Sequence, residues 1–194
     1  VFALKDDRSS SARVLLISPL RVVIEAAASA EKARFSYRYI YTPFTPVVRV
    51  EARCEQDSIQ PWSECHFLHA SWKDARYAGY LTADMDKPTA INPKGAKSKN
   101  FASDRWAVYT DGTNAVGVAS GFYVTGWDAS DEFVYYVVAA RDSWDTREME
   151  RTALLYFGPA QTREGFGHWF SKDTFASATK DGRAWIATEP LTMR

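Results

Sequence analysis

The sequence predicts an all-β fold, an antiparallel β-sandwich with very little helix. Apolar and polar residues alternate with a period of two along many short segments, turn residues separate those segments, and helical periodicity is nearly absent. Strands that follow one another without intervening helices favour a sandwich over an α/β fold. A length of 194 residues suits one domain, 1–194. The chain begins at Val1 and not at Met, so we also expect that it is either a processed chain or a piece of a longer one.

The clearest strand runs from Arg34 to Tyr41. One face would carry Phe35, Tyr37, Tyr39 and Tyr41, and the other Arg34, Ser36, Arg38 and Ile40. Prolines at 43 and 46 interrupt the run, and the alternation resumes from Val47 to Arg53. We expect the tyrosines to pack in a core, with a binding platform as the alternative, and the arginines to lie on a solvated or cleft-lining face.

The rest of the chain is predicted from shorter patterns. Asp111 and Gly112 predict a hairpin between strands at 104–110 and 115–120, because Asp-Gly tolerates the backbone that such turns require. In the first of these strands Trp106 and Val108 share one face. Pro19 predicts an edge or a bend, a short helix capped by Asp145 is expected at 146–151, and 82–100 reads as a long loop. Further strands are expected at 14–17, 20–26, 61–72, 122–125, 132–140, 151–157 and 184–188, with a loop or hairpin at 27–32.

Charge and hydropathy limit the classes of partner that the chain can bind. Lys and Arg number 24, as do Asp and Glu, so no long-range field would attract nucleic acid. No apolar run is long enough to span a membrane, and no signal peptide is recognisable. The aromatic share of 14% is high, and aromatic rings are platforms for sugars as well as sheet residues. These features do not fix the cellular location of the protein, for which secretion or the periplasm is one option.

Candidate chemistry gathers in 61–72, which holds two of the three histidines and one of the two cysteines. A regular strand would place His66 on the same face as Glu64 and Trp72, and His69 on the opposite face. Glu64 would then orient the imidazole of His66.

The two cysteines, Cys54 and Cys65, flank a polar loop. Either they form a disulfide between neighbouring strands or they remain two small buried thiols, and the strand register decides between these. A zinc site is less well supported, because the cysteines and histidines lack ligand spacing. We expect no metal and no cofactor.

Three stretches together, RFSYRYIYTPFTPVVRVEARCEQ, WSECHFLHASW and DRWAVYTDGTNAVGVAS, resemble the large β-sandwich domains of carbohydrate-active enzymes. More narrowly, they resemble the galactose-mutarotase-like supersandwich of several polysaccharide lyases and glycoside hydrolases. The resemblance covers Arg34 to Ser120 and implies a polysaccharide or oligosaccharide as partner, together with further domains of the same chain.

Three functions fit these observations. In a lyase or hydrolase, His66 would be a general acid or base, with Tyr39 assisting proton transfer and Arg105 or Arg38 binding an anionic group. Arg38, Trp72 and Trp127 would bind the substrate, the two tryptophans as stacking platforms. The alternatives are a non-catalytic sugar-binding sandwich of a multidomain enzyme, and a protein-interaction sandwich with a flat apolar sheet face. Convergence of His66, Arg105 and a tyrosine on one concave surface would favour catalysis.

Overall fold

The computed structural model describes residues 9–19, 21–30, 32–43, 45–72, 77–91, 100–127 and 136–171. These residues form two antiparallel sheets and one short helix, which confirms the all-β sandwich. The strands are β1 (Ser11–Ser18), β2 (Arg21–Ala30), β3 (Ala33–Tyr41), β4 (Val47–Gln56), β5 (Trp62–Trp72), β6 (Gly79–Thr82), β7 (Thr89–Ala90), β8 (Asn100–Ser103), β9 (Trp106–Thr110), β10 (Asn114–Ser120), β11 (Tyr123–Trp127), β12 (Tyr136–Trp144) and β13 (Glu148–Pro159), and the helix is α1 (Arg163–Phe170).

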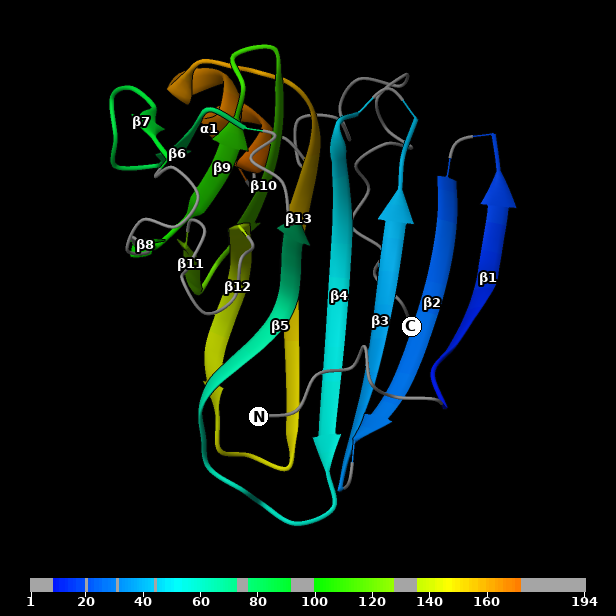
Figure 1. The fold of residues 1–194 in the computed structure, drawn as a ribbon. Coiled ribbons are helices and arrows are strands. Elements are labelled where there is room, and N and C mark those ends of the chain that lie inside the picture. Colours follow the sequence, from blue (N-terminus) through cyan, green and yellow to red (C-terminus); the bar gives the residue numbers. More distant parts are fainter. Residues whose placement is uncertain are drawn as a thin grey trace.

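The large sheet has nine strands in the order β1-β2-β3-β4-β13-β10-β9-β6-β7, and the small sheet has four in the order β5-β12-β11-β8. The small sheet packs on one face of the large sheet through a core that includes Val50, Phe67, Tyr109, Val118 and Val138. Figure 1 shows the small sheet beside β13, with β1 to β4 continuing away from it as long neighbouring ribbons. Only one half of the large sheet is therefore sandwiched.

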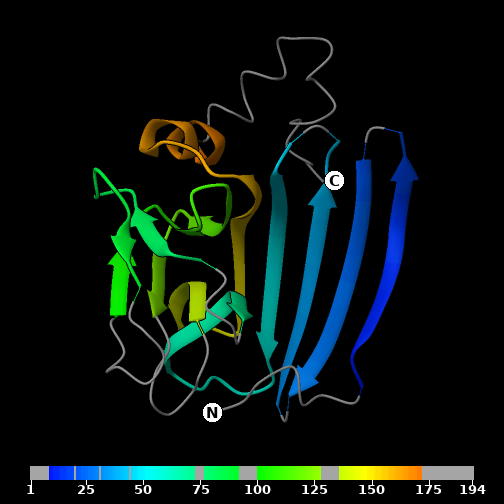
Figure 2. The same ribbon diagram turned by 45° about the horizontal axis from the view of Figure 1, so that its top comes forward.

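Helix α1 covers the opposite face of that sandwiched half, as the view in Figure 2 shows. Phe166 and Phe170, one turn apart, pack on Trp106 and Tyr156 in a second core. The hydroxyl of Thr162 accepts a hydrogen bond from the backbone N–H of Gly165 and caps the helix. The sequence did not predict this helix, because two glycines in eight residues give it a low propensity that only packing overcomes.

The prediction of a short helix at 146–151 is wrong, because a strand occupies most of these positions. Strand β13 begins at Glu148 and pairs with β4 in the large sheet, whereas β12 before it belongs to the small sheet. Met149 and Ala153 of β13 are drawn into the core between the two sheets, which favours a strand here over a helix. The loop expected at 82–100 contains the two-residue strand β7, and 92–99 lie outside the described residues. The strand expected at 132–140 is described from Tyr136 onward, and the strand expected at 184–188 lies outside the described residues.

Several strand predictions are confirmed. Gly112 has a positive φ of 86° in the turn between β9 and β10, as the Asp-Gly pair predicts. Trp106 and Val108 face α1, whereas Tyr109 faces the small sheet. In β3, Tyr37 is buried in the core and Tyr41 is exposed, so the aromatic row runs out from the sandwich into the uncovered half of the sheet.

The uncovered part of the sheet, which is β1, β2 and the end of β3 at Tyr41, is called here the open half. The edge strand β1, which ends before Pro19, exposes Val14, Leu16 and Ile17, the last of them at 74%. On the polar face Arg13 and Arg38 both bind Glu25, at 2.5 Å and 3.2 Å between nitrogen and oxygen. These two arginines therefore share one carboxylate. No helix among the described residues is long and apolar enough to cross a membrane.

Candidate functional site

A bulge in β5 brings the two histidines of this strand together. Arg141 of β12 pairs with His66 and Ala140 pairs with Leu68, so Phe67 is an extra residue without a partner. Phe67 and Leu68 both turn into the core, and the alternation is shifted by one residue after them. The prediction that the histidines face opposite ways is therefore wrong, and their ring centroids lie 6.0 Å apart on the outer face of the small sheet.

A charged and aromatic group surrounds these rings. The Glu64 carboxylate accepts hydrogen bonds from His66 Nε2 at 2.5 Å and from Arg141 Nη1 at 2.7 Å. The guanidinium carbon of Arg141 also lies 4.5 Å from the ring centroid of Tyr123, which pairs with it across β11 and β12. We call Glu64, His66, His69, Tyr123 and Arg141 the histidine–arginine cluster. Its polar groups are partly open to solvent, with 23% of the His66 side chain and 31% of the Arg141 side chain exposed.

The cluster sets the charge of two of its members. Partial burial acts to raise the pKa of Glu64, but the hydrogen bonds from Arg141 and His66 outweigh it and the pKa lies below its usual value. Desolvation, with a smaller contribution from His66, lowers the pKa of His69. At neutral pH the cluster therefore presents a carboxylate, a guanidinium and a neutral imidazole side by side.

The remaining predicted catalytic residues lie elsewhere. Tyr39 is on the apolar face of β3, stacked beside Tyr37, and burial raises its pKa. Arg38 is on the opposite face of the same strand, bound to Glu25. Arg105 lies in the turn before β9, largely exposed and 3.4 Å from Asp84. The structure does not bring His66, Tyr39 and Arg105 onto one surface, and of these three only His66 belongs to the cluster.

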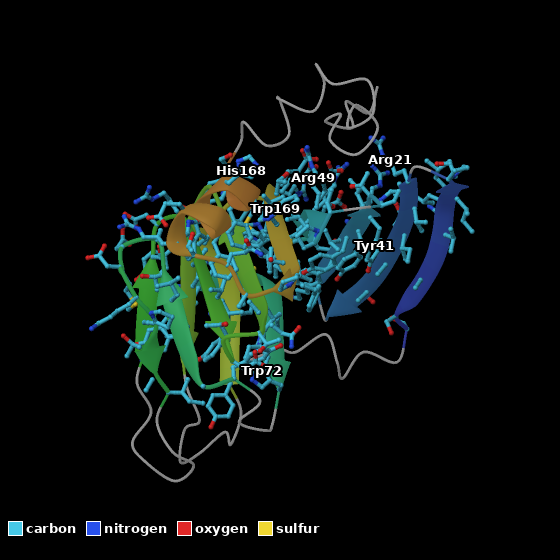
Figure 3. The ribbon with its side chains drawn as sticks, turned by 90° about the horizontal axis from the view of Figure 1, so that it is seen from above. Arg21, Tyr41, Arg49, Trp72, His168 and Trp169 are labelled. Carbon is cyan, nitrogen blue, oxygen red and sulfur yellow. The ribbon has the colours of Figure 1, made fainter. Side chains whose placement is uncertain are left out.

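Trp72, predicted as a stacking platform, packs between the sheets. Its ring centroid is 4.9 Å from that of Tyr109 and 5.2 Å from that of Tyr77. The indole N–H of Trp72 is buried and has no acceptor among the described residues. Figure 3 shows Trp72 on the opposite side of the large sheet from His168 and Trp169 of α1. The backbone of Trp127 ends β11, and its side chain lies outside the described part of the chain.

A surface hollow of about 360 Å³ lies over β2 to β4, away from the cluster. Ala27 and Ser36 are among its small lining residues, and Arg34 and Arg53 flank it. Both guanidinium groups are already bound to acidic side chains, Arg34 to Asp57 at 2.7 Å and Arg53 to Glu55 at 2.8 Å. The hollow therefore presents little unbalanced charge to a ligand.

Metal ligands do not gather in the described residues, where no group of three or more His, Cys, Asp and Glu side chains is placed to hold an ion. Cys65 points into the core while its neighbour His66 points outward, which separates the thiols from the imidazoles.

Sequence reasoning missed Arg141 and Tyr123, the two members of the cluster that β11 and β12 contribute. Both lie more than 50 positions after His66, and neither belongs to a local motif. Their proximity depends on the pairing of β12 with β5 and β11.

No protein-family model and no curated protein matches this chain. Solved structures do match, and those described below, at 7–8% identity, show the fold alone. A GH36 α-galactosidase from Geobacillus stearothermophilus, the AgaA A355E variant, superposes with a TM-score of 0.55 at 8% identity over 89% of this chain and 30% of its own. The α-galactosidase AgaB of the same organism has a TM-score of 0.54 at 8% identity, over 76% of this chain and 27% of its own.

A putative aldose 1-epimerase from Klebsiella pneumoniae matches 93% of this chain and 58% of its own, with a TM-score of 0.52 and 7% identity. This chain therefore spans about three-tenths of the matching α-galactosidases and somewhat over half of the epimerase. The sandwich is similar to β-domains of sugar-processing enzymes, as the sequence resemblance implies in its broader form.

Proposed function

We propose that this chain is a carbohydrate-binding β-sandwich domain of a glycoside hydrolase-related multidomain protein, and that the histidine–arginine cluster holds the saccharide. The observation that carries the proposal is the arrangement around Arg141, which lies over the ring of Tyr123 and binds Glu64 beside two imidazoles. Sugar recognition uses planar hydrogen-bonding side chains next to an aromatic face, and this cluster supplies both.

The charges of the cluster suit either an anionic or a neutral sugar as the ligand. The guanidinium of Arg141 can donate to a uronate carboxylate or to ring hydroxyls, since only some of its five N–H donors are used by Glu64. Glu64, whose pKa is lowered, is ionised at neutral pH and can accept hydrogen bonds from sugar hydroxyl groups. The similarity to domains that occupy less than a third of longer α-galactosidase chains supports the accessory role.

Acid–base catalysis at the same cluster is the second candidate, a lyase or a hydrolase with His66 as general acid or base. The neutral imidazole of His69 beside His66 favours it, because proton transfer needs a basic and an acidic group in reach of one substrate. In this version Arg141 takes the anion-binding role that the sequence predicted for Arg105 or Arg38.

The test is a titration of the protein with neutral and uronic oligosaccharides. Isothermal calorimetry and intrinsic fluorescence measure the binding. We expect at least one class to bind, and Arg141→Ala and His66→Ala to raise its Kd by about tenfold or more, the cost of a hydrogen bond to a charged group. The matched control Arg105→Ala removes the same charge away from the cluster and should leave Kd unchanged. Circular dichroism confirms that the variants are folded.

Two outcomes would contradict the proposal. Binding that survives both substitutions would place the sugar elsewhere. Silence across the whole panel would favour the protein-interaction function, for which the exposed apolar side chains of β1 are the motivation. Assays for unsaturated uronate product and for reducing ends separate catalysis from binding, because catalysis requires turnover by the wild type that His66→Ala abolishes.

A further inference from the structure

The two cysteines meet between the sheets. Cys54 lies on β4 of the large sheet and is fully buried, and Cys65 lies on β5 of the small sheet and packs against the same core. The two thiols interact directly, since each is the largest influence on the pKa of the other. The strand order explains the contact, because β4 and β5 follow one another in sequence and lie in opposite sheets. The two thiols thus span the interior of the sandwich and do not join neighbours in one sheet.

Their surroundings hold both strands in place. Cys54 pairs in register with Phe35 on one side and with Met149 on the other, and Cys65 pairs with Asp142. Asp142 in turn binds Arg151 of the large sheet at 2.6 Å, and the ring of Phe35 contacts Trp144 at 5.9 Å between centroids. These inter-sheet contacts fix the separation of the two strands at the position of the cysteines.

We propose that Cys54 and Cys65 form a reversible disulfide that joins the small sheet to the large sheet. Both side chains enter the same core from strands of opposite sheets, and a side-chain rotation between such neighbouring thiols can supply the sulfur–sulfur bonding distance of about 2 Å. The inference is independent of the proposed function. It makes the sandwich a thiol modification site whose partner is a small-molecule disulfide such as oxidised glutathione.

The exchange proceeds in two steps with balanced atoms and electrons. The thiolate of Cys65 attacks one sulfur of oxidised glutathione, which breaks that disulfide and releases one glutathione thiolate. Cys54 then gives up its proton to the solvent and attacks the Cys65 sulfur of the mixed disulfide, which releases the second glutathione thiolate. Two protein thiols are oxidised and one molecule of oxidised glutathione is reduced to two of the thiol.

The order of attack follows from exposure. Cys65 is only partly buried, and the interaction with Cys54 lowers its pKa against the effect of burial. The same interaction, together with burial, raises the pKa of Cys54. Cys65 is therefore the sulfur that meets the reagent, and Cys54 is the resolving thiol inside the core.

The experiment incubates the folded chain with reduced and then with oxidised glutathione, alkylates the remaining thiols in denaturant, and maps peptides under non-reducing conditions. We expect one intramolecular peptide pair that links Cys54 to Cys65 with the loss of two hydrogen atoms. Because the bond closes a loop of about eleven residues, oxidation should lower the equilibrium constant of unfolding by about a hundredfold. In the Cys65→Ala variant the oxidant should leave the equilibrium constant of unfolding unchanged.

Three results would overturn the proposal. The first is two alkylated cysteines after oxidation of the native protein. The second is a stable glutathione adduct on Cys65 that Cys54 does not resolve. The third is a disulfide between two copies of the chain. The peptide map of the wild type distinguishes all of them, so the test does not depend on the folding of any variant.

Discussion

The two halves of the large sheet are stabilised differently. In the sandwiched half the small sheet covers one face and α1 the other, so Tyr109, Val118 and Tyr156 have no exposed surface. In the open half β1 leaves Ile17 and its neighbours exposed, and the polar face is held by paired charges around Glu25. Burial of apolar area contributes far more per residue than exposed ion pairs do. The difference indicates that the sandwiched half carries most of the stability and that the open half depends on it.

The largest effect is expected from an aromatic residue of the sandwiched half. Tyr109→Ala removes a ring that contacts Trp72, Phe101 and Tyr136, and should lower the free energy of unfolding by about 3–5 kcal/mol. The matched change Tyr41→Ala in the open half, at a residue 41% exposed, should cost about 1 kcal/mol or less. Urea unfolding measures both values. Equal losses would show that the two halves do not differ in this way.

A smaller effect is expected at the cap of α1. Thr162→Ala removes the acceptor for the Gly165 N–H and should cost about 1 kcal/mol, whereas Thr162→Ser keeps the acceptor and should cost much less. The global midpoint of urea unfolding is the measurement, with far-UV circular dichroism as the probe. If that midpoint is unchanged while α1 alone frays, the helix is no part of the cooperative sandwich and its cover of Trp106 contributes little.

The smallest effect is expected in the open half, at Glu25. The hydrogen bond from Arg13 lowers its pKa, against the effect of burial, and Arg38 adds to the lowering. A carboxylate with a lowered folded pKa contributes stability that is complete above its unfolded pKa of about 4.3 and is lost as the pH falls through the folded value. Glu25→Gln should therefore cost about 0.5–1 kcal/mol at pH 7 and nothing at low pH or in about 1 M salt.

The control for this charge change is Asp104→Asn, which removes a carboxylate outside the Arg13–Glu25–Arg38 group. Thermal unfolding between pH 3 and pH 7, at low and at high salt, compares the two variants. A cost at Glu25 that persists unchanged in high salt would point to packing and would contradict the ionic account of the open half.

Strand identity was largely predictable because it depends on local alternation. The run from Arg34 to Tyr41 and the Asp111–Gly112 turn are read correctly from adjacent residues alone, and so are the opposite directions of Val108 and Tyr109. The sequence also predicted the basic face of β3, but not the carboxylates that pair with its arginines, such as Glu25 with Arg38. These features were accessible because a period of two residues commits every side chain in a strand to a face.

The candidate site was predictable only in part. His66 and Glu64 are two residues apart, so their hydrogen bond followed from the strand pattern. Arg141 and Tyr123 come from other strands, and the bulge at Phe67 depends on how β5 fits β12 over the core. A one-residue shift reverses the face of every following side chain, which is why His69 was assigned to the opposite face.

Local alternation in the chain thus settled the strands, the β9–β10 hairpin and the sandwich class. Long-range packing determined the division of the large sheet into covered and open halves and the formation of α1. It also determined which residues surround His66 in the histidine–arginine cluster and that Cys54 and Cys65 lie together in the core. The physical reason is the range of the forces involved. Backbone sterics and side-chain alternation act between neighbours, whereas sheet order, bulges and inter-sheet contacts arise from burial summed over residues far apart in sequence.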